Sequence, residues 1–145
     1  MSRLNRCMFA SFALVSALAS AQEIAMLRDL DALGRATLSK DELSVLLPDA
    51  KMSRVTATGI TQIWKNGSDG SFIISSDNRG LGVLPSTAQG KWHISADGRY
   101  CVLIEWKRNP TEEWCRYIVR AGNEHYAIRS DKTGTEKVHK LSISK

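Results

Sequence analysis

The chain has 145 residues, of which 43% are hydrophobic and 24% charged, and its formal net charge is +5. This length fits one compact domain and leaves no room for a second large one. With only 3 proline and 10 glycine residues, the composition excludes a disordered or collagen-like chain, and no apolar run after residue 21 is long enough to span a bilayer.

The first 21 residues have the three parts of a secretory signal peptide in the right order. Arg3 and Arg6 form a basic start, residues 7–19 are apolar, and Ala19-Ser20-Ala21 is a small-x-small cleavage site before Gln22. The apolar stretch is too short to cross the roughly 30 Å of a bilayer core. We therefore expect cleavage after Ala21 and a periplasmic or secreted domain of residues 22–145, with an uncleaved anchor as the less favoured alternative.

Loss of the signal peptide removes much of the basic excess. The basic count falls from 20 to 18 against 15 acidic residues, which leaves a formal charge of +3. An exported protein seldom meets nucleic acid, so we expect no nucleic-acid partner. A weak contact with an anionic envelope surface is conceivable through Lys132, Lys137 and Lys140, although an ordinary solvated face explains them better.

Two segments before the strands contain helix signals. Residues 23–33 contain good helix formers and end at Gly34, a suitable C-cap, so they are either a short helix or a frayed tail. Ser39 and Glu42 have the spacing of a capping box for a second helix, which Pro48 ends. The apolar face that should lie against a sheet consists of Leu43, Leu46 and Leu47.

From Met52 onward, apolar and polar residues alternate with period two, which predicts β-strands. Short glycine-containing turns separate them and favour antiparallel neighbours. The expected fold is mainly β (α+β at most), an antiparallel meander that forms a strongly bent sheet or small barrel with a short N-terminal helix packed on it. The predicted strands are 52–58, 60–66, 71–76, 80–84, 90–95, 99–106, 113–120, 125–130 and 136–143.

The same alternation assigns residues to the two faces of the strands. Near the C-terminus, Tyr126 and Ile128 are expected to face the core, and His125, Ala127 and Arg129 to face water. The predicted core consists of Trp64, Phe72, Ile74, Trp92, Ile94, Val102, Ile104, Trp106 and Ile118.

Cys101 and Cys115 are the only cysteines after residue 21, and an exported protein usually joins such a pair. They lie in two β-prone segments connected by a turn. A hairpin centred on Arg108 places Cys101 opposite Cys115, Val102 opposite Trp114 and Leu103 opposite Glu113, so both thiols are on one side at cross-strand distance. We predict a structural disulfide.

The chain contains a series of short motifs: Gly90-Lys91-Trp92, Asp97-Gly98-Arg99-Tyr100-Cys101, Trp106 and Cys115, with Tyr126 after them. Over about residues 38–130 the chain resembles a family of small exported proteobacterial proteins of unknown function, and the series up to Cys115 is the specific part of the resemblance. The resemblance implies a periplasmic or secreted protein without supplying an activity, ligand or catalytic residue.

The titratable residues show no catalytic or metal-binding pattern. His93, His125 and His139 have no ligand at a short metal-binding spacing. Three glutamates are near the hairpin tip: Glu105, Glu112 and Glu113. Charge pairing with Lys107, Arg108 and Arg116 accounts for them without a catalytic role. We therefore predict no catalytic residue, no metal and no cofactor.

The tryptophans are the remaining candidates for a binding site, because aromatic side chains at a barrel mouth can hold an apolar ligand or a sugar ring. We single out Trp114, with Trp106 and Trp92 as further candidates. The favoured hypothesis is a non-enzymatic envelope protein that binds a small ligand, a glycan or another protein. An inhibitor of a lytic enzyme and a small periplasmic hydrolase are the alternatives.

Overall fold

The computed structural model describes residues 24–145, so the predicted signal peptide lies outside the described residues. Apart from two short helical elements, η1 and α1, the ordered segments are strands. The elements are η1 (Leu27–Leu33), β1 (Ala36–Thr37), α1 (Lys40–Leu46), β2 (Lys51–Val55), β3 (Thr61–Lys65), β4 (Ser71–Ser76), β5 (Ser86–Ile94), β6 (Tyr100–Glu105), β7 (Glu112–Ala121), β8 (Glu124–Ile128), β9 (His139–Lys140) and β10 (Ser142–Ser144).

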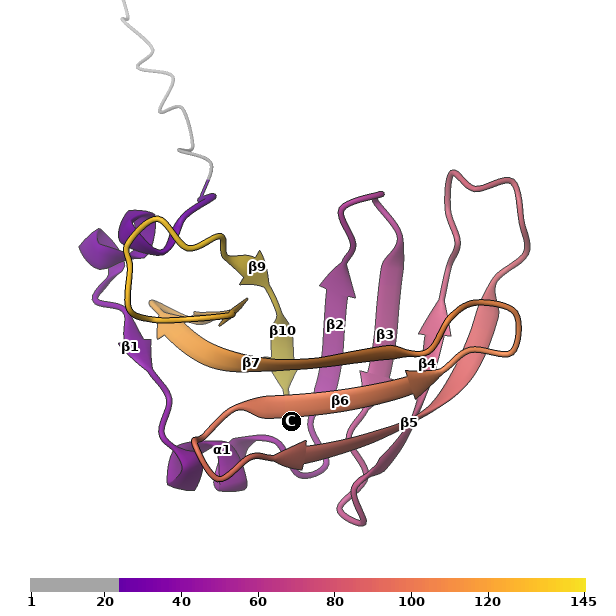
Figure 1. Cartoon of the computed structure of the whole chain (residues 1–145), viewed down its shortest axis with the longest axis horizontal. Helices are drawn as coiled ribbons and strands as arrows, with labels where there is room; N and C mark the ends of the chain where they lie inside the picture. The colour runs from indigo at the N-terminus through magenta and orange to yellow at the C-terminus, as the bar shows by residue number, and fades with distance from the viewer. Residues whose placement is uncertain (1–23) are drawn as a thin grey trace, which may run out of the picture.

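The sheet is an antiparallel meander in which each strand from β2 to β8 pairs with the next one in sequence. The C-terminal segment then joins the two edges, because β9 pairs with β8 and β10 pairs with β2. These pairings nearly close the sheet into a barrel, which confirms the predicted fold class (Figure 1).

The two ends of the barrel differ. At the helix end, α1 begins at Ser39, whose hydroxyl accepts a hydrogen bond from Glu42 N at 3.1 Å, while Glu42 Oε2 accepts one from Ser39 N at 2.8 Å. Leu43 and Leu47 are fully buried in the core. The opposite end, called the hairpin end here, consists of the loops 56–60, 77–85 and 106–111.

The other helical element, η1, is a 3-10 helix rather than an α-helix, and it ends at Gly34 as predicted. It packs on the outer face of β7 and β8, where a second apolar cluster forms. The fully or nearly fully buried members of this cluster are Leu27, Leu30, Val119, Ala121, Tyr126 and Ile128.

The second cluster corrects the face assignment of β8. Tyr126 and Ile128 are buried as expected, but beneath η1 on the outside of the barrel. Ala127, expected to face water, belongs to the main core. The residues of β8 alternate between two faces as predicted. Both faces are buried against apolar side chains here, because η1 packs on the outer face of the sheet.

The main core contains every residue that the sequence predicted for it, either buried or packed against the buried residues. It also includes Met52, Tyr100 and Leu141, which the prediction omitted. The predicted strand 80–84 is wrong, however. This segment is part of the loop 77–85, where Gly80 and Gly82 have φ angles of 83° and 66°, incompatible with an extended strand.

A buried polar network lies at the helix end of the core. Trp64 Nε1 donates to Asn66 Oδ1 and to the Tyr100 hydroxyl, both at 3.1 Å. The Tyr100 hydroxyl donates to Asn66 Oδ1 at 2.8 Å, and Asn66 Nδ2 donates to the Leu47 carbonyl at 3.1 Å. Burial raises the pKa of Tyr100 above its usual range, so the group stays a neutral donor. This network attaches β3 and β6 to the end of α1.

Tyr100→Phe removes one donor and one acceptor from this network and leaves Asn66 and Trp64 less well satisfied. We expect the free energy of unfolding to fall by about 1–3 kcal/mol, as for other buried hydrogen-bond losses. Tyr117→Phe is the matched control, because its hydroxyl donates only to exposed Asp97 at 3.3 Å. Urea unfolding measures both variants, and equal losses would contradict the role given to the network.

The predicted disulfide is present between Cys101 and Cys115, whose Cα atoms are 4.0 Å apart. The predicted register is also confirmed, with Val102 opposite Trp114 and Leu103 opposite Glu113. The bridge therefore connects β6 and β7 on the outer face of the sheet, while Trp114 points inward. It stabilises the register that positions Trp114.

Cys115→Ser should lower the free energy of unfolding by about 2–5 kcal/mol, because the unfolded chain regains the freedom that the bridge removes. The double variant Cys101→Ser/Cys115→Ser should lose about the same amount, since the bridge needs both residues. Alkylation without reductant should label neither cysteine of the protein that begins at Gln22. A single variant as stable as the unmodified protein would contradict a stabilising bridge.

Candidate functional site

The structure separates the three tryptophans proposed as ligand-binding residues. Trp92 lies at the helix end, where its Nε1 donates to the Gly67 carbonyl at 2.8 Å and its ring centroid is 6.2 Å from that of Tyr100. These contacts attach β5 to the turn 67–70. Trp92 is therefore a structural anchor, whereas Trp106 and Trp114 border the polar part of the barrel interior.

Glu112 connects the surroundings of Trp106 and Trp114. Its Oε1 accepts a hydrogen bond from Trp106 Nε1 at 2.9 Å, and its Oε2 pairs with Arg54 Nη2 at 2.7 Å. Arg54 Nε also donates to Gln62 Oε1 at 2.7 Å. Both carboxylate oxygens of Glu112 are thus engaged, and the Arg54 guanidinium is held in one orientation.

An opening in the barrel wall lies beside this pair because β7 changes partners along its length. Residues 112–116 pair with β6, whereas residues 117–121 pair with β8. The edge of residues 112–116 that faces away from β6 has no strand partner in the described part of the chain. A pocket of about 370 Å³, called the side pocket here, opens there and is lined by Arg54, Val55, Thr56, Ala57, Glu112, Trp114, Arg116, Ala127, Arg129, His139, Lys140 and Leu141.

The side pocket is strongly basic. Four of its residues carry a permanent positive charge, and Glu112 is the only carboxylate in its lining. Arg54 is paired with Glu112, and Lys140 is paired with Glu124 at 3.1 Å. Within residues 24–145, neither Arg116 nor Arg129 has a carboxylate within ion-pair distance. Their positive charges are left without a direct counterion.

Trp114 forms the inner wall of the side pocket. Its ring packs edge-on against Tyr100 at 5.7 Å, and the Cζ atoms of Arg54 and Arg116 lie 5.3 and 5.9 Å from the ring centroid. The indole Nε1 is buried and has no hydrogen-bond partner in the described part of the chain. Trp114 therefore has a buried N–H without an acceptor, and guanidinium groups already pack against its ring.

The pKa directions describe the same positive environment. Burial lowers the pKa of Arg116, and nearby Arg129 and Arg54 lower it further, although Glu136 partly opposes them. Burial also lowers the pKa of His139, and Arg116, Arg129, Arg54 and Lys137 add to this effect. Cations with depressed pKa values are incompletely compensated, so an added negative charge here would stabilise them.

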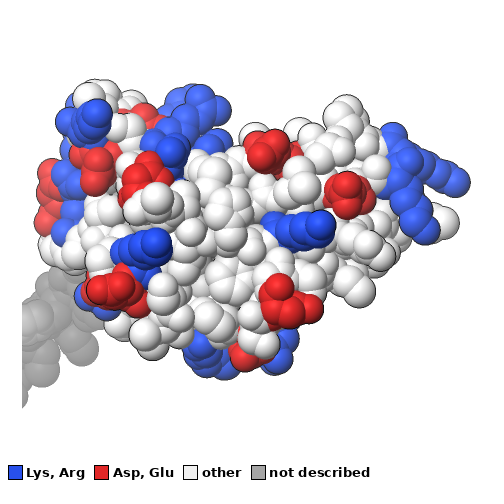
Figure 2. All heavy atoms as spheres, turned by 60° about the horizontal axis from the view of Figure 1, so that its bottom comes forward, with Lys and Arg blue, Asp and Glu red and all other residues white. Residues whose placement is uncertain are grey.

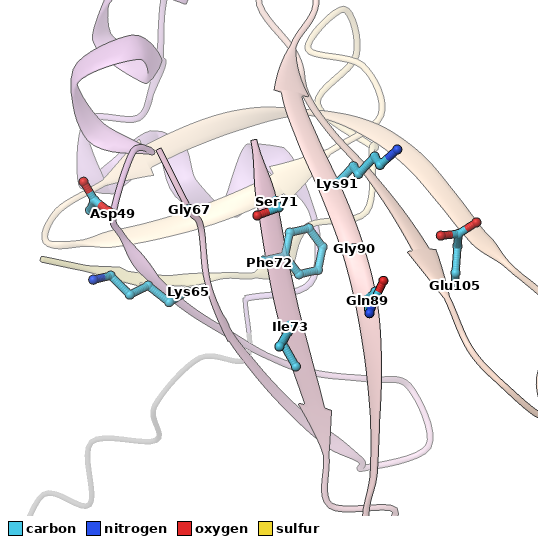
Figure 3. Close-up of a pocket in the computed structure, with 10 residues that line it drawn as sticks. All are labelled: Asp49, Lys65, Gly67, Ser71, Phe72, Ile73, Gln89, Gly90, Lys91 and Glu105. Atoms are coloured by element: carbon cyan, nitrogen blue, oxygen red, sulfur yellow. The ribbon is translucent and has the colours of Figure 1, made fainter. Parts of the chain in front are cut away.

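A second hollow, of about 510 Å³, lies on the outer face of β4 and β5 (Figure 3). The Phe72 ring packs against Gly90 there, where a Cβ would lie 2.2 Å from the ring. The surrounding side chains are exposed and of both charges, with Lys65 and Lys91 on either side and Glu105 directed away. None of its lining residues has a buried side-chain donor without a partner, unlike Trp114 in the side pocket.

The other candidate residues are not brought together. His93 is exposed, as the alternation predicted, and Glu105 and Glu113 lie on the outside of the sheet. No group of three metal-binding side chains occurs within residues 24–145. Of the lysines considered for an envelope contact, Lys140 borders the side pocket, whereas Lys137 is opposite Met26 and Lys132 is in the preceding loop.

The arginines and His139 of the side pocket were not predicted as site residues from the sequence. They come from β2, β7, the end of β8 and β9, so no local motif connects them. A readable signal did exist in β7, where Arg116 occupies the same face as Trp114 and Ile118. Burying a charged side chain costs free energy, so a charged residue on an apolar strand face indicates a candidate functional site.

Comparison with known proteins gives no match: no family model, curated protein or solved structure is significantly similar to this chain. No helix within residues 24–145 is long and apolar enough to cross a membrane. The geometry of the side pocket is therefore the main observation that bears on function.

The depressed pKa of His139 predicts a pH dependence of stability. The unfolded chain takes up a proton near the ordinary histidine pKa of 6.5, whereas the folded protein resists protonation of His139. The free energy of unfolding should therefore fall as the pH drops through and below this value. His139→Gln should reduce this fall.

Burial also lowers the pKa of His125. This residue should therefore account for part of the pH dependence that remains in His139→Gln. Urea unfolding at a series of pH values compares His139→Gln with the unmodified protein. An identical pH dependence in His139→Gln and the unmodified protein would contradict the environment assigned to His139.

Proposed function

We propose that this protein is an exported, non-enzymatic binding module that holds a small organic anion in the side pocket. The observation that carries the proposal is the convergence of Arg116, Arg129 and Trp114 on one opening in the barrel wall, together with a buried Trp114 indole N–H that has no acceptor in the described part of the chain. The signal-like N-terminus supports export, and the disulfide is compatible with an oxidising compartment.

An anion would supply the negative charge and the hydrogen-bond acceptors that the lining of the side pocket lacks. Guanidinium groups bind carboxylates and phosphates through paired, charge-assisted hydrogen bonds, which are stronger when partly shielded from water. Arg116 and Arg129 have the required charge without a carboxylate partner in the described chain, and Trp114 adds a neutral donor. A carboxylate or phosphate group would also reduce the repulsion between the arginines.

The size of the side pocket favours an organic anion over a bare ion. Its volume of about 370 Å³ is within the range of roughly 300–1,000 Å³ that small-molecule sites occupy. The apolar part of the lining, from Val55, Ala127 and Leu141, can contact the rest of the ligand. Glu112 is poorly suited to act as a general base, because Trp106 and Arg54 already engage both of its oxygens.

Two anionic probes, inorganic phosphate and citrate, test the proposal by calorimetric titration and thermal unfolding. Both should bind and raise the melting temperature, and binding should weaken as the salt concentration increases. Arg116→Gln should weaken binding roughly tenfold or more, the effect of losing one charge-assisted hydrogen bond.

Arg79→Gln is the matched control, since the Arg79 side chain is 84% exposed and does not line the side pocket. It should bind both probes like the unmodified protein. Absence of binding, or equal weakening by Arg79→Gln and Arg116→Gln, would contradict an anion site in the side pocket.

A further inference from the structure

The hairpin end carries exposed aliphatic side chains that neither the core nor the side pocket explains. Leu81, Val83 and Leu84 have exposed fractions of 54%, 60% and 85%. They are within four consecutive residues of the loop 77–85, which projects beyond the barrel (Figure 1). Single exposed aliphatic residues are ordinary, but a cluster at the tip of a projecting loop is typical of an interaction surface.

The base of the loop is held by specific hydrogen bonds. Asn78 Nδ2 donates to the Leu84 carbonyl at 2.6 Å and to Ser86 Oγ at 3.0 Å, while Ser76 Oγ donates to Asn78 Oδ1 at 2.8 Å. Asp77 Oδ1 accepts from the backbone N–H groups of Thr61 and Arg79 at 2.9 and 3.1 Å. These contacts fix both ends of the loop and keep its aliphatic side chains directed away from the core.

Basic residues surround this apolar tip. Arg79 is in the same loop, and Lys107 and Arg108 are in the loop 106–111, which lies beside it because Leu81 shares a hollow with Trp106 and Pro110. Figure 2 shows basic side chains gathered at the right-hand end of the molecule, where these hairpins lie in Figure 1.

The acidic residues nearby reduce this positive charge only in part. The Asp77 carboxylate pairs weakly with Arg79 at 3.6 Å and accepts the loop hydrogen bonds described above. Glu105 and Glu113 are farther back, on the outer faces of β6 and β7.

We propose that the hairpin end docks on the surface of an anionic lipid bilayer. Leu81, Val83 and Leu84 enter the interfacial layer, and Arg79, Lys107 and Arg108 remain at the level of the lipid phosphates. The apolar residues at the tip and the basic residues behind it match the order of the acyl boundary and the phosphate layer of a bilayer. A projecting tip also suits a deformable lipid surface better than a rigid protein partner. The proposal is independent of anion binding in the side pocket.

Vesicle co-sedimentation tests the proposal on protein purified from the cell envelope. The vesicles contain either phosphatidylcholine alone or equal parts of phosphatidylcholine and phosphatidylglycerol. We expect binding to the anionic vesicles, weaker binding at high salt and little binding to the neutral ones. Leu81→Ser/Leu84→Ser should reduce binding roughly tenfold or more, since burying one leucine side chain alone corresponds to such a factor. Lys107→Gln/Arg108→Gln should reduce binding to the anionic vesicles at low salt.

Ile73→Ser is the matched control, because Ile73 is 66% exposed on the outer face of β4, away from the loop tips. It should bind vesicles like the unmodified protein, and all variants should have the same circular dichroism spectrum. Comparison between variants also cancels any contribution of the N-terminal segment, which is the same in each. Failure to bind anionic vesicles, or equal loss in Ile73→Ser, would overturn the proposal. Capture of an envelope protein through the leucines without vesicle binding would do the same.

Discussion

The change of partner along β7 is the constraint on which the rest of the structure depends. Its first half completes the hairpin with β6, and its second half pairs with β8. One strand therefore serves two parts of the sheet, and the wall opens where the halves meet. The C-terminal segment connects the two edges of the sheet, because β9 pairs with β8 and β10 pairs with β2. The disulfide fixes the register of the first half, so Trp114 and Arg116 face the interior beside the opening.

The polar groups of the barrel interior have hydrogen-bond partners at the helix end but lack some of them at the side pocket. At the helix end, Trp64, Asn66 and Tyr100 satisfy one another, as buried polar groups normally do. At the side pocket, Arg116 has no carboxylate partner in the described chain, and the Trp114 indole N–H has no acceptor there. Such groups reduce stability when water is excluded, so their concentration at one opening supports a binding role.

Local and periodic signals predicted much of the fold. The Ser39–Glu42 capping box, the Cys101–Cys115 register and the members of the core depend on short spacings, and the structure confirms them. The loop 77–85 was misread in part as a strand because its aliphatic residues imitate one, whereas Gly80 and Gly82 turn the chain. The side pocket could not be predicted, since its arginines meet only after the sheet curves and closes. The sequence predicted Trp114 as a stacking surface, whereas the structure shows that its indole N–H is buried and has no acceptor in the described part of the chain.

The proposed binding of an anion between the arginines and the indole N–H of Trp114 is tested most directly by nuclear magnetic resonance. In a titration of the ¹⁵N-labelled protein with citrate, each tryptophan gives one indole N–H signal. The account predicts that the Trp114 signal shifts most, because this donor gains a hydrogen bond, while the signals of Trp64 and Trp92, already bonded to Asn66 and Gly67, change little. An unchanged Trp114 signal at citrate saturation, or equal shifts of all the tryptophans, would contradict it.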